Sequence, residues 1–215
     1  RVSGAVDRHR IERVIGRRVW DSRGRPTVEA DVVLSSGAVG RAIAPAGAST
    51  GANEAIDLRD GGRAFGGLGV SRAVGHVSTE IAAALHGLPI MDQAAIDRRL
   101  IELDGTPNKA RLGGNATVAV SMAAVHAAAA ARGEPLWRHL AGPDGPTLPM
   151  PMVQIFGGGA HAGRRVDVQD FLIMPIGAST FEEAMSMAAR VYESAGRIMA
   201  DRGALRGVAD EGGWW

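Results

Sequence analysis

Polar and apolar residues alternate with a period of two near the beginning of the chain. Residues 27–34 carry this alternation, residues 11–19 precede them as a further strand, and the turn Ser35-Ser36-Gly37 leads into a third at 38–44. Strands joined by short turns that contain glycine are typical of antiparallel hairpins. The pattern therefore predicts a three-stranded antiparallel meander, followed by a loop of small residues at 45–51.

From residue 70 onwards the apolar residues adopt helical spacing. One apolar stripe is formed by Val70, Val74, Val77, Ile81 and Leu85. Gly87 and Pro89 should end this helix. Further helices are predicted at 91–103, 115–132 and 136–140. Asp92 is the expected N-cap of the helix at 91–103, and the helix at 115–132 is apolar on nearly all sides, which is typical of a buried helix. The first part of the chain is therefore expected to be an α+β domain.

Glycine and proline are concentrated at residues 142–146, which indicates a domain boundary. We expect an N-terminal α+β domain over residues 1–141, a linker over 142–150 and a second domain over 151–215. In that second part, strands are predicted at 150–156, 166–174 and 205–209, and an amphipathic helix at 180–202. Thr180 is the expected N-cap of this helix.

Composition and charge narrow the function classes. The chain has 215 residues, 24 Lys+Arg against 23 Asp+Glu, a formal charge of +1 and no cysteine. This balance excludes a strongly basic nucleic-acid-binding protein, and the lack of cysteine excludes disulfides, thiolate metal sites and cysteine nucleophiles. Lys109 is the only lysine, so any chemistry that needs a lysine must use it or be absent.

No membrane-spanning segment is expected. The most apolar stretch, residues 116–131, is interrupted by Ser121 and His126 and is shorter than the roughly 20 residues that a span needs. No apolar segment of a signal peptide follows the first charged residues. We therefore expect a soluble, cytoplasmic protein, with a secondary surface or secreted pool left open.

Two glycine-rich loops are candidates for ligand contact. Residues 47–51 could present the hydroxyl of Ser49 to a phosphate or a metal, and a tight turn after a strand is the alternative. Residues 157–163 surround His161, and three consecutive glycines there would let a ligand approach the backbone closely. The alternative for this loop is a flexible connection with a solvated histidine.

Carboxylates at two further places could carry chemistry. Gln169 and Asp170 lie in an otherwise apolar strand, where a carboxylate must be paired, bound to a ligand or at a strand end. Asp210 and Glu211 follow the last predicted strand, at the position where barrel enzymes collect catalytic groups. A capped turn is the alternative for this pair.

Taken together, these segments resemble the enolase family over nearly the whole chain. In the first half the matching motifs are Asp21-Ser22-Arg23-Gly24, Pro26-Thr27-Val28-Glu29, Gly47-Ala48-Ser49-Thr50-Gly51, Leu58-Arg59-Asp60-Gly61, Leu103-Asp104-Gly105-Thr106 and Gly114-Asn115-Ala116. In the second half they are residues 149–152, Gly158-Gly159, His161-Ala162, Val166-Asp167, Gln169, Phe171, Met174-Pro175 and Asp210-Glu211-Gly212-Gly213. The resemblance implies an N-terminal α+β domain followed by the start of an enolase-type α/β (TIM-like) barrel.

The resemblance also implies a hydro-lyase that interconverts 2-phosphoglycerate and phosphoenolpyruvate in glycolysis and gluconeogenesis, with Mg²⁺ as cofactor. Glu211 would be the general acid, and Gln169 and Asp170 would face the substrate and its leaving hydroxyl. His161 would close over the phosphate end. Ser49 would move in with its loop to bind the second Mg²⁺. The family further implies a homodimer formed through the N-terminal domain.

Several residues depart from the family pattern. Asp170 stands where the family usually has Glu, and Gln154 and Gly157 stand where it usually has Asn. Arg25 also replaces an Asn, and Trp214 replaces a smaller aromatic residue. These changes leave open a relative from phosphonate biosynthesis, similar to carboxyphosphonoenolpyruvate synthase.

An enolase is about twice as long as this chain. The rest of the family's barrel carries the base lysine and the three carboxylates that bind the first Mg²⁺. The residues after 150 would supply about three strands and one helix of the barrel, leaving an apolar helix face uncovered. We therefore expect this chain to be incomplete and inactive as it stands. A truncated enolase-like protein with a binding or assembly role and no turnover is the third alternative.

Overall fold

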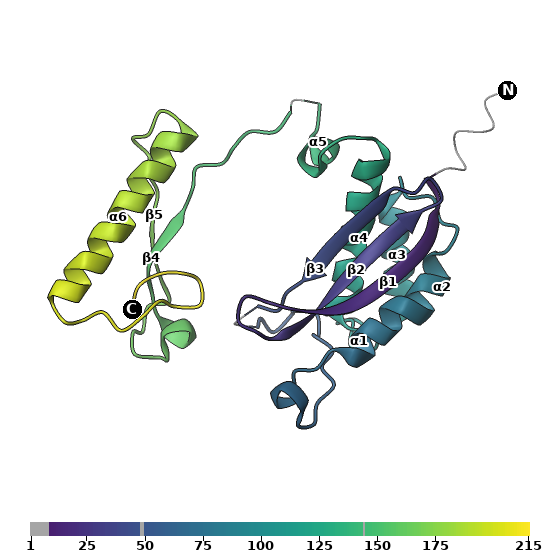
Figure 1. Cartoon of the computed structure of the whole chain (residues 1–215), viewed down its shortest axis with the longest axis horizontal. Coiled ribbons are helices and arrows are strands. Elements are labelled where there is room, and N and C mark those ends of the chain that lie inside the picture. The colour runs from purple at the N-terminus through teal and green to yellow at the C-terminus, as the bar shows by residue number, and fades with distance from the viewer. Residues whose placement is uncertain (1–8, 48–49, 144) are drawn as a thin grey trace. The chain divides into compact units, whose positions relative to one another are not determined.

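The computed structural model describes residues 9–47, 50–143 and 145–215, with the backbone alone at residue 161. The chain divides into two compact units, Arg1–Pro146 and Thr147–Trp215. Each unit has its own sheet, of three strands in the first and two in the second (Figure 1).

The sheet of the first unit is the expected antiparallel meander. Strands β1 (Ile11–Trp20), β2 (Pro26–Leu34) and β3 (Val39–Ala44) pair in the order β1-β2-β3. All nine residues of the central strand β2 are buried, whereas β3 alternates between exposed and buried positions. The alternation along β3 shows that one face of the sheet packs on the core, as the period of two predicts. On the other face, Glu29 and Asp31 of β2 are buried under their ion pairs with Arg17 and Arg41.

Helices cover that core face in the predicted order. The first helical stretch runs through α1 (Ser71–His76), a π-helical turn η3 (Val77–Ile81) and α2 (Ala82–Leu85), after a short 3₁₀ turn η2 (Ala64–Gly67). It is followed by α3 (Gln93–Asp104), α4 (Gly114–Ala131) and α5 (Leu136–Leu140). The carboxylate of Asp92 accepts the N–H of Ala95 at 2.9 Å, which confirms it as the cap of α3.

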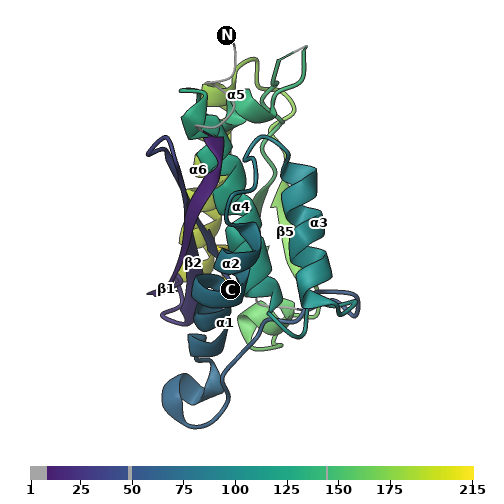
Figure 2. The same ribbon diagram turned by 90° about the vertical axis from the view of Figure 1, so that its right-hand side faces the viewer.

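Helix α4 is the centre of the first unit. It packs against β2 and β3 on one side and against α3 on another, and Figure 2 shows it between the sheet and α3. Its alanines allow a very close approach to the sheet: a Cβ at Gly40 of β3 would overlap the backbone at Ala123 and Ala127. Only glycine fits at this position.

By length and composition alone, α4 is long and apolar enough to cross a membrane, whereas the sequence analysis expected no such segment. Among the described residues it is the single such helix, and 61% of it is buried inside the fold. The sheet and the neighbouring helices that cover it account for its apolar composition.

The second unit contains a β-hairpin and one long helix. Strands β4 (Val153–Gly157) and β5 (Asp170–Ile173) pair antiparallel, and the 3₁₀ turn η4 (Gly159–Ala162) lies in the connection between them. Helix α6 (Phe181–Asp201) follows, capped by the Thr180 hydroxyl, which accepts the N–H of Glu183 at 3.1 Å. Both strands are shorter than predicted. Strand β5 begins only at Asp170, because the carbonyls of residues 166 and 169 accept the N–H groups of Gly159 and Gly158 in the connection.

The predicted strand at 205–209 is wrong. This segment makes only an isolated bridge, between Val208 and Trp214. A strand needs a neighbouring strand to accept its hydrogen bonds, and here Arg206 and Gly207 bond to Trp215 at the end of the same turn. In the described part of the chain, the second unit therefore has two paired strands rather than three.

Candidate active site

The end of the β4–β5 hairpin brings together three polar side chains from separate segments. Asp170 begins β5, Gln154 lies on β4, and Glu211 lies in the turn after residue 209. The Gln154 side-chain amide donates to Oδ1 of Asp170 and, at 3.0 Å, to Oε2 of Glu211. Two carboxylates are thus joined through one amide group.

Gln169 extends this cluster. Its side-chain amide donates to Oδ2 of Asp170 at 3.0 Å, so both oxygens of that carboxylate accept a hydrogen bond. Asp170 is half-buried, while Gln169 and Glu211 are exposed. The structure therefore brings together three of the residues singled out in the sequence, namely Gln169, Asp170 and Glu211. The side chain of His161 lies outside the described residues.

Glycines allow the surrounding backbone to close around Gln154. The N–H of Gly213 donates to Oε1 of Gln154 at 2.8 Å. A Cβ at Gly213 would lie only 2.6 Å from that oxygen and from the nitrogen of Gly157, and a Cβ at Gly157 would overlap the Cβ of Ala209. The turn that carries Glu211 can approach β4 only because these two positions lack side chains.

Trp214 holds the same turn against α6. Its ring stacks on Tyr192 at a centroid distance of 4.5 Å, and its Nε1 donates to the carbonyl of Tyr192 at 2.9 Å. Tyr192 returns a bond from its hydroxyl to the carbonyl of Gly212 at 2.8 Å. The large ring fits because residue 196 is glycine, where an added Cβ would lie 2.7 Å from Trp214.

The first unit has a separate polar region around the loop that follows β3. A hollow of about 750 Å³ is lined by this loop, by Asn108 and by the N-terminus of α4. Asn115 of α4 ties down the segment after the loop: its side chain bonds both the N–H and the carbonyl of Leu58, at 3.2 and 3.1 Å. Ser49, the expected metal ligand of this loop, lies outside the described residues.

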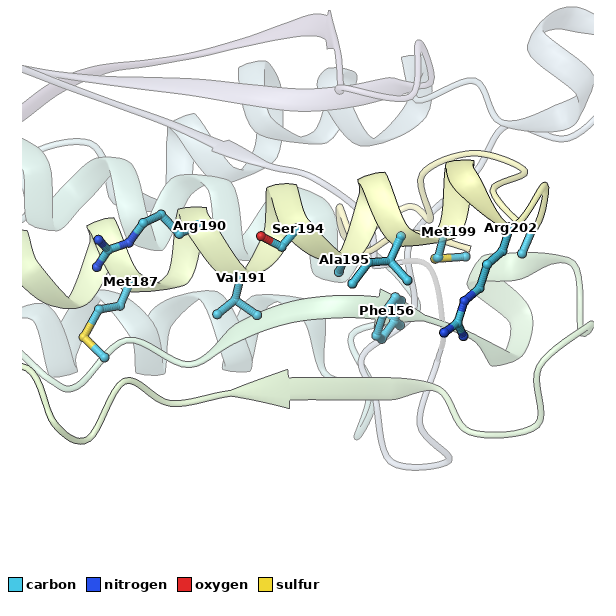
Figure 3. A pocket seen from close by; sticks show the side chains of 10 residues that line it. Phe156, Met187, Arg190, Val191, Ser194, Ala195, Met199 and Arg202 are labelled. Carbon is cyan, nitrogen blue, oxygen red and sulfur yellow. The ribbon is translucent and has the colours of Figure 1, made fainter.

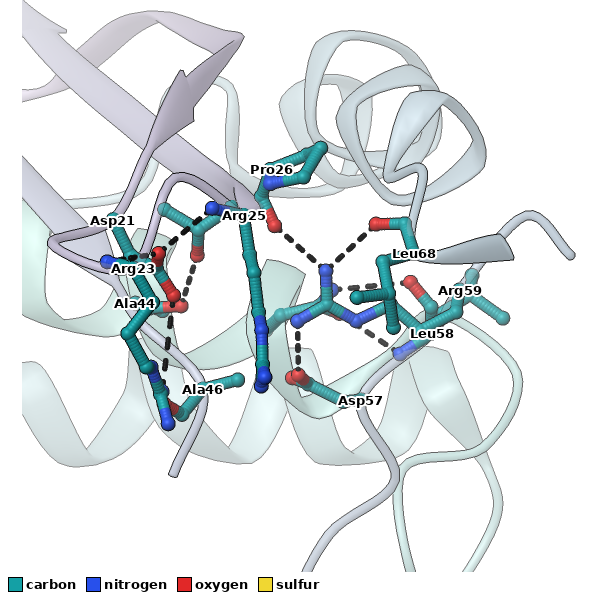
Figure 4. A network of polar contacts seen from close by, with 12 residues as sticks. Asp21, Arg23, Arg25, Pro26, Ala44, Ala46, Asp57, Leu58, Arg59 and Leu68 are labelled. Atoms are coloured by element: carbon teal, nitrogen blue, oxygen red, sulfur yellow. Dashed lines mark hydrogen bonds and ion pairs between the residues drawn. The ribbon is translucent and has the colours of Figure 1, made fainter. Parts of the chain in front are cut away.

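A network of arginines supports the start of that loop (Figure 4). Arg59 donates to the carbonyls of Pro26 and Leu68 at 2.6 and 2.9 Å and pairs with Asp57 at 2.7 Å. Arg23 donates to the carbonyl of Ala46, which links the turn after β1 to the loop. The motifs around residues 21–24 and 58–61 therefore serve as a scaffold for this loop.

Asp21 is the acceptor at the centre of the turn after β1. Its Oδ1 accepts the N–H groups of Arg23 and Arg25, both at 2.9 Å. Burial by itself raises the pKa of Asp21, but these two bonds and the charges of the two arginines outweigh it and hold the pKa below its ordinary value of 3.8. The carboxylate is charged at neutral pH and keeps the turn closed.

The described residues do not by themselves compose a site for a divalent cation. No group of three His, Asp or Glu side chains within the described ranges is close enough to hold a metal ion. Asp170 and Glu211 supply two carboxylates, but each already accepts a hydrogen bond from Gln154. Mg²⁺ prefers an octahedral set of oxygen ligands, which this pair does not provide.

A second hollow of about 650 Å³ lies along α6 (Figure 3). It is lined mainly by apolar side chains, among them Phe156, Met187, Val191 and Met199. Val191 and Ile198 are exposed there. This confirms the expected uncovered apolar helix face. The polar residues that line the hollow, Arg190, Ser194 and Arg202, include no carboxylate, which separates it from the carboxylate cluster.

The chain matches two protein-family models. Residues 11–140 match the N-terminal domain of enolase, and residues 146–215 match the enolase C-terminal TIM barrel domain. The chain therefore belongs to the enolase family, as the resemblance of its motifs implied. Members of this family are hydro-lyases that typically use Mg²⁺. The expected fold is confirmed: a three-stranded antiparallel sheet with helices is followed by part of the barrel domain.

Sequence reasoning gave Gln154 no role beyond its departure from the family pattern. A lone glutamine on a strand carries no signal of its own. Its contact with Glu211 spans 57 residues along the chain, so only the fold brings the two together.

The packing of Trp214 on α6 generates a testable prediction. Gly196→Ala should lower the stability of the second unit by about 1–3 kcal/mol through overpacking, because the new Cβ meets the indole ring. This loss outweighs the gain of about 1 kcal/mol that alanine brings to a helix interior. Thermal unfolding of the protein measures the change.

Gly75→Ala is the matched control, since Gly75 lies in α1 with open space around it. We expect this control to unfold at the wild-type temperature or above it. A Gly196→Ala variant as stable as the control would contradict the proposed packing.

Proposed function

We propose that the intact protein, meaning this chain together with the rest of the enolase barrel, catalyses the reversible dehydration of 2-phosphoglycerate to phosphoenolpyruvate. The observation that carries this proposal is the pair of carboxylates, Asp170 and Glu211, joined through Gln154 in a chain of the enolase family. A lyase of this kind needs an acid group beside the leaving hydroxyl, and the cluster offers two carboxyl groups at the end of one hairpin.

The reaction removes a proton from C2 and a hydroxide from C3. The C2 proton lies beside a carboxylate and is very weakly acidic, so a base must take it. As the C–O bond at C3 breaks with its electron pair, the Glu211 carboxyl donates a proton to the departing oxygen and water leaves. The electron pair left at C2 forms the C2–C3 double bond. Asp170 and Gln169 would face the leaving hydroxyl, and His161 the phosphate.

The base is not assigned to the described residues. Lys109, the only lysine of the chain, lies in the first unit, where its Nζ donates to the carbonyl of Thr106 at 3.1 Å. We therefore propose that the 215-residue chain alone does not turn over substrate. Mg²⁺ is expected from the family, with Ser49 as one ligand, and no step above depends on its placement.

Phosphonate chemistry is the second candidate. The observation that favours it is the grouping of three departures from the family pattern, Gln154, Gly157 and Asp170, around one cluster. Altered residues at a reacting centre are expected where the substrate differs. A protein without turnover, with a binding or assembly role, is the remaining alternative.

We further propose a domain division at residues 1–141, 142–150 and 151–215, and a cytoplasmic location. The Pro/Gly-rich stretch at 142–146 supports this division. The complete lack of cysteine is compatible with a reducing compartment.

The outer face of the first sheet supports the proposal of a homodimer. Arg17 lies opposite Glu29, and Asp31 lies opposite Arg41, in adjacent strands. Arg41 bonds Asp31 at 2.7 Å, and this bond together with the charge of Arg17 outweighs burial and holds the pKa of Asp31 below its ordinary value of 3.8. Ile43 on the same face is 40% exposed.

We propose that a second copy of the chain covers this face. Sedimentation of the intact protein should show a dimer, and a monomer would contradict the proposal.

The activity itself is tested by the formation of phosphoenolpyruvate, followed by its ultraviolet absorbance, in the presence of Mg²⁺. We expect turnover by the intact protein and none by the 215-residue chain alone. Glu211→Gln should lower kcat on the order of 10²–10⁴-fold, because the amide cannot donate the proton that the carboxyl supplies. Glu193→Gln, an exposed glutamate of α6, is the matched control and should keep the wild-type rate.

Turnover of a phosphonate substrate alone would favour the second candidate. No turnover of either substrate by the intact protein would contradict the proposed lyase. A wild-type rate in Glu211→Gln would remove Glu211 from the role of acid.

A further inference from the structure

The side-chain amide of Gln154 makes most of the hydrogen bonds that it can form. The nitrogen donates to Asp170 and Glu211, and the oxygen accepts the N–H of Gly213 at 2.8 Å. A glutamine side chain can make about four hydrogen bonds, so three of them are satisfied within this one cluster. The side chain is half-buried on β4, which restricts its rotamers.

These bonds fix the arrangement of the two carboxylates. Without this shared donor, each carboxyl group could turn away towards water and lose its place relative to the other. An amide nitrogen carries two hydrogens in a fixed plane, so it can bind one oxygen of each group at a defined angle. The bond from Gly213 prevents the amide from rotating, because it holds the oxygen on the opposite side.

We infer that Gln154 is a positioning residue, which holds the acid groups of Asp170 and Glu211 at the separation and orientation that the reaction needs. This inference rests on the proposed lyase function and gives the site an additional determinant. Gln154 does not itself exchange a proton with substrate.

The departures from the family pattern support this role. Asp170 is one methylene shorter than the usual Glu, and Gln154 is one methylene longer than the usual Asn. The longer Gln154 and the shorter Asp170 still meet in a hydrogen bond.

Gly157 is the third departure from the family pattern in this cluster. It pairs with Asp170 in the register of the hairpin, directly beside the amide. A Cβ at Gly157 would lie 3.2 Å from Oε1 of Gln154 and would overlap Ala209. A side chain at position 157 would therefore clash with Ala209 and crowd the amide of Gln154, so the glycine leaves room for the longer glutamine.

A purely structural role is the alternative, because Gln154 also ties the turn at 210–213 to β4 through Gly213. That role would make the effect of Gln154 independent of the length of residue 170. The positioning role makes the two residues interdependent.

A double-mutant cycle in the intact protein separates these roles. Gln154→Asn and Asp170→Glu, each alone, should lower kcat roughly 10- to 100-fold, as expected for lost hydrogen bonds to charged groups, with little change in KM. The double variant restores the usual family pair and should recover at least 10-fold over the weaker single variant. Met152→Leu is the matched control, since this side chain two positions before Gln154 is 61% exposed, and it should keep the wild-type rate. Effects of the two substitutions that simply multiply, with no recovery, would overturn the inference.

A second readout does not depend on turnover. In the intact protein labelled with ¹⁵N, the two side-chain amide protons of Gln154 should have separate signals. Glu211→Gln should move one of them, and Asp170→Asn the other. Amide signals that respond to neither variant would overturn the inference even where the enzyme is active. If the intact protein dehydrates no substrate, the lyase proposal fails, while these signals still decide whether Gln154 bridges the two carboxylates.

Discussion

The close contact between α4 and the sheet is the constraint on which the first unit depends. An 18-residue helix without a charged side chain must be covered on nearly all sides, and its alanines let the sheet approach until only glycine fits at position 40. The burial of Val28, Val32 and Val120 follows from that contact. The helix N-terminus, through Asn115, then fixes the segment that follows the loop at 45–51. Packing in the core thus positions a loop that the family motifs single out.

The second unit also depends on close contacts that only glycine permits, but there they position side chains instead of a helix. Two carboxyl groups from distant parts of the chain must stay close to each other, and the turn that carries Glu211 pairs with β4 only through an isolated bridge between Phe156 and Trp214. Glycines at 157 and 213 bring backbone against backbone, Trp214 fills the space left by Gly196, and the amide of Gln154 joins the acids. The site therefore depends on small residues as much as on charged ones.

Much of the fold could be predicted from the sequence, because local patterns report local structure. The period of two predicts the meander, and helical spacing predicts the helices. The caps Asp92 and Thr180 are confirmed by their hydrogen bonds. The strand at 205–209 was wrong because strand formation depends on a partner that no local pattern reveals. The bridging contacts of Gln154 were missed for the same reason, since they join residues that lie far apart in the sequence. The roles of Ser49 and His161 stay predictions.

The most direct test of the central claim separates the two halves of the reaction. In D₂O, the Glu211→Gln variant of the intact protein is incubated with 2-phosphoglycerate and Mg²⁺, and exchange of the C2 hydrogen is followed by NMR beside the formation of phosphoenolpyruvate. Because Glu211 is placed at the leaving oxygen and not at C2, we expect exchange to continue while dehydration is lost. Loss of both activities together, or dehydration at the wild-type rate, would contradict the assignment of Glu211 as the acid.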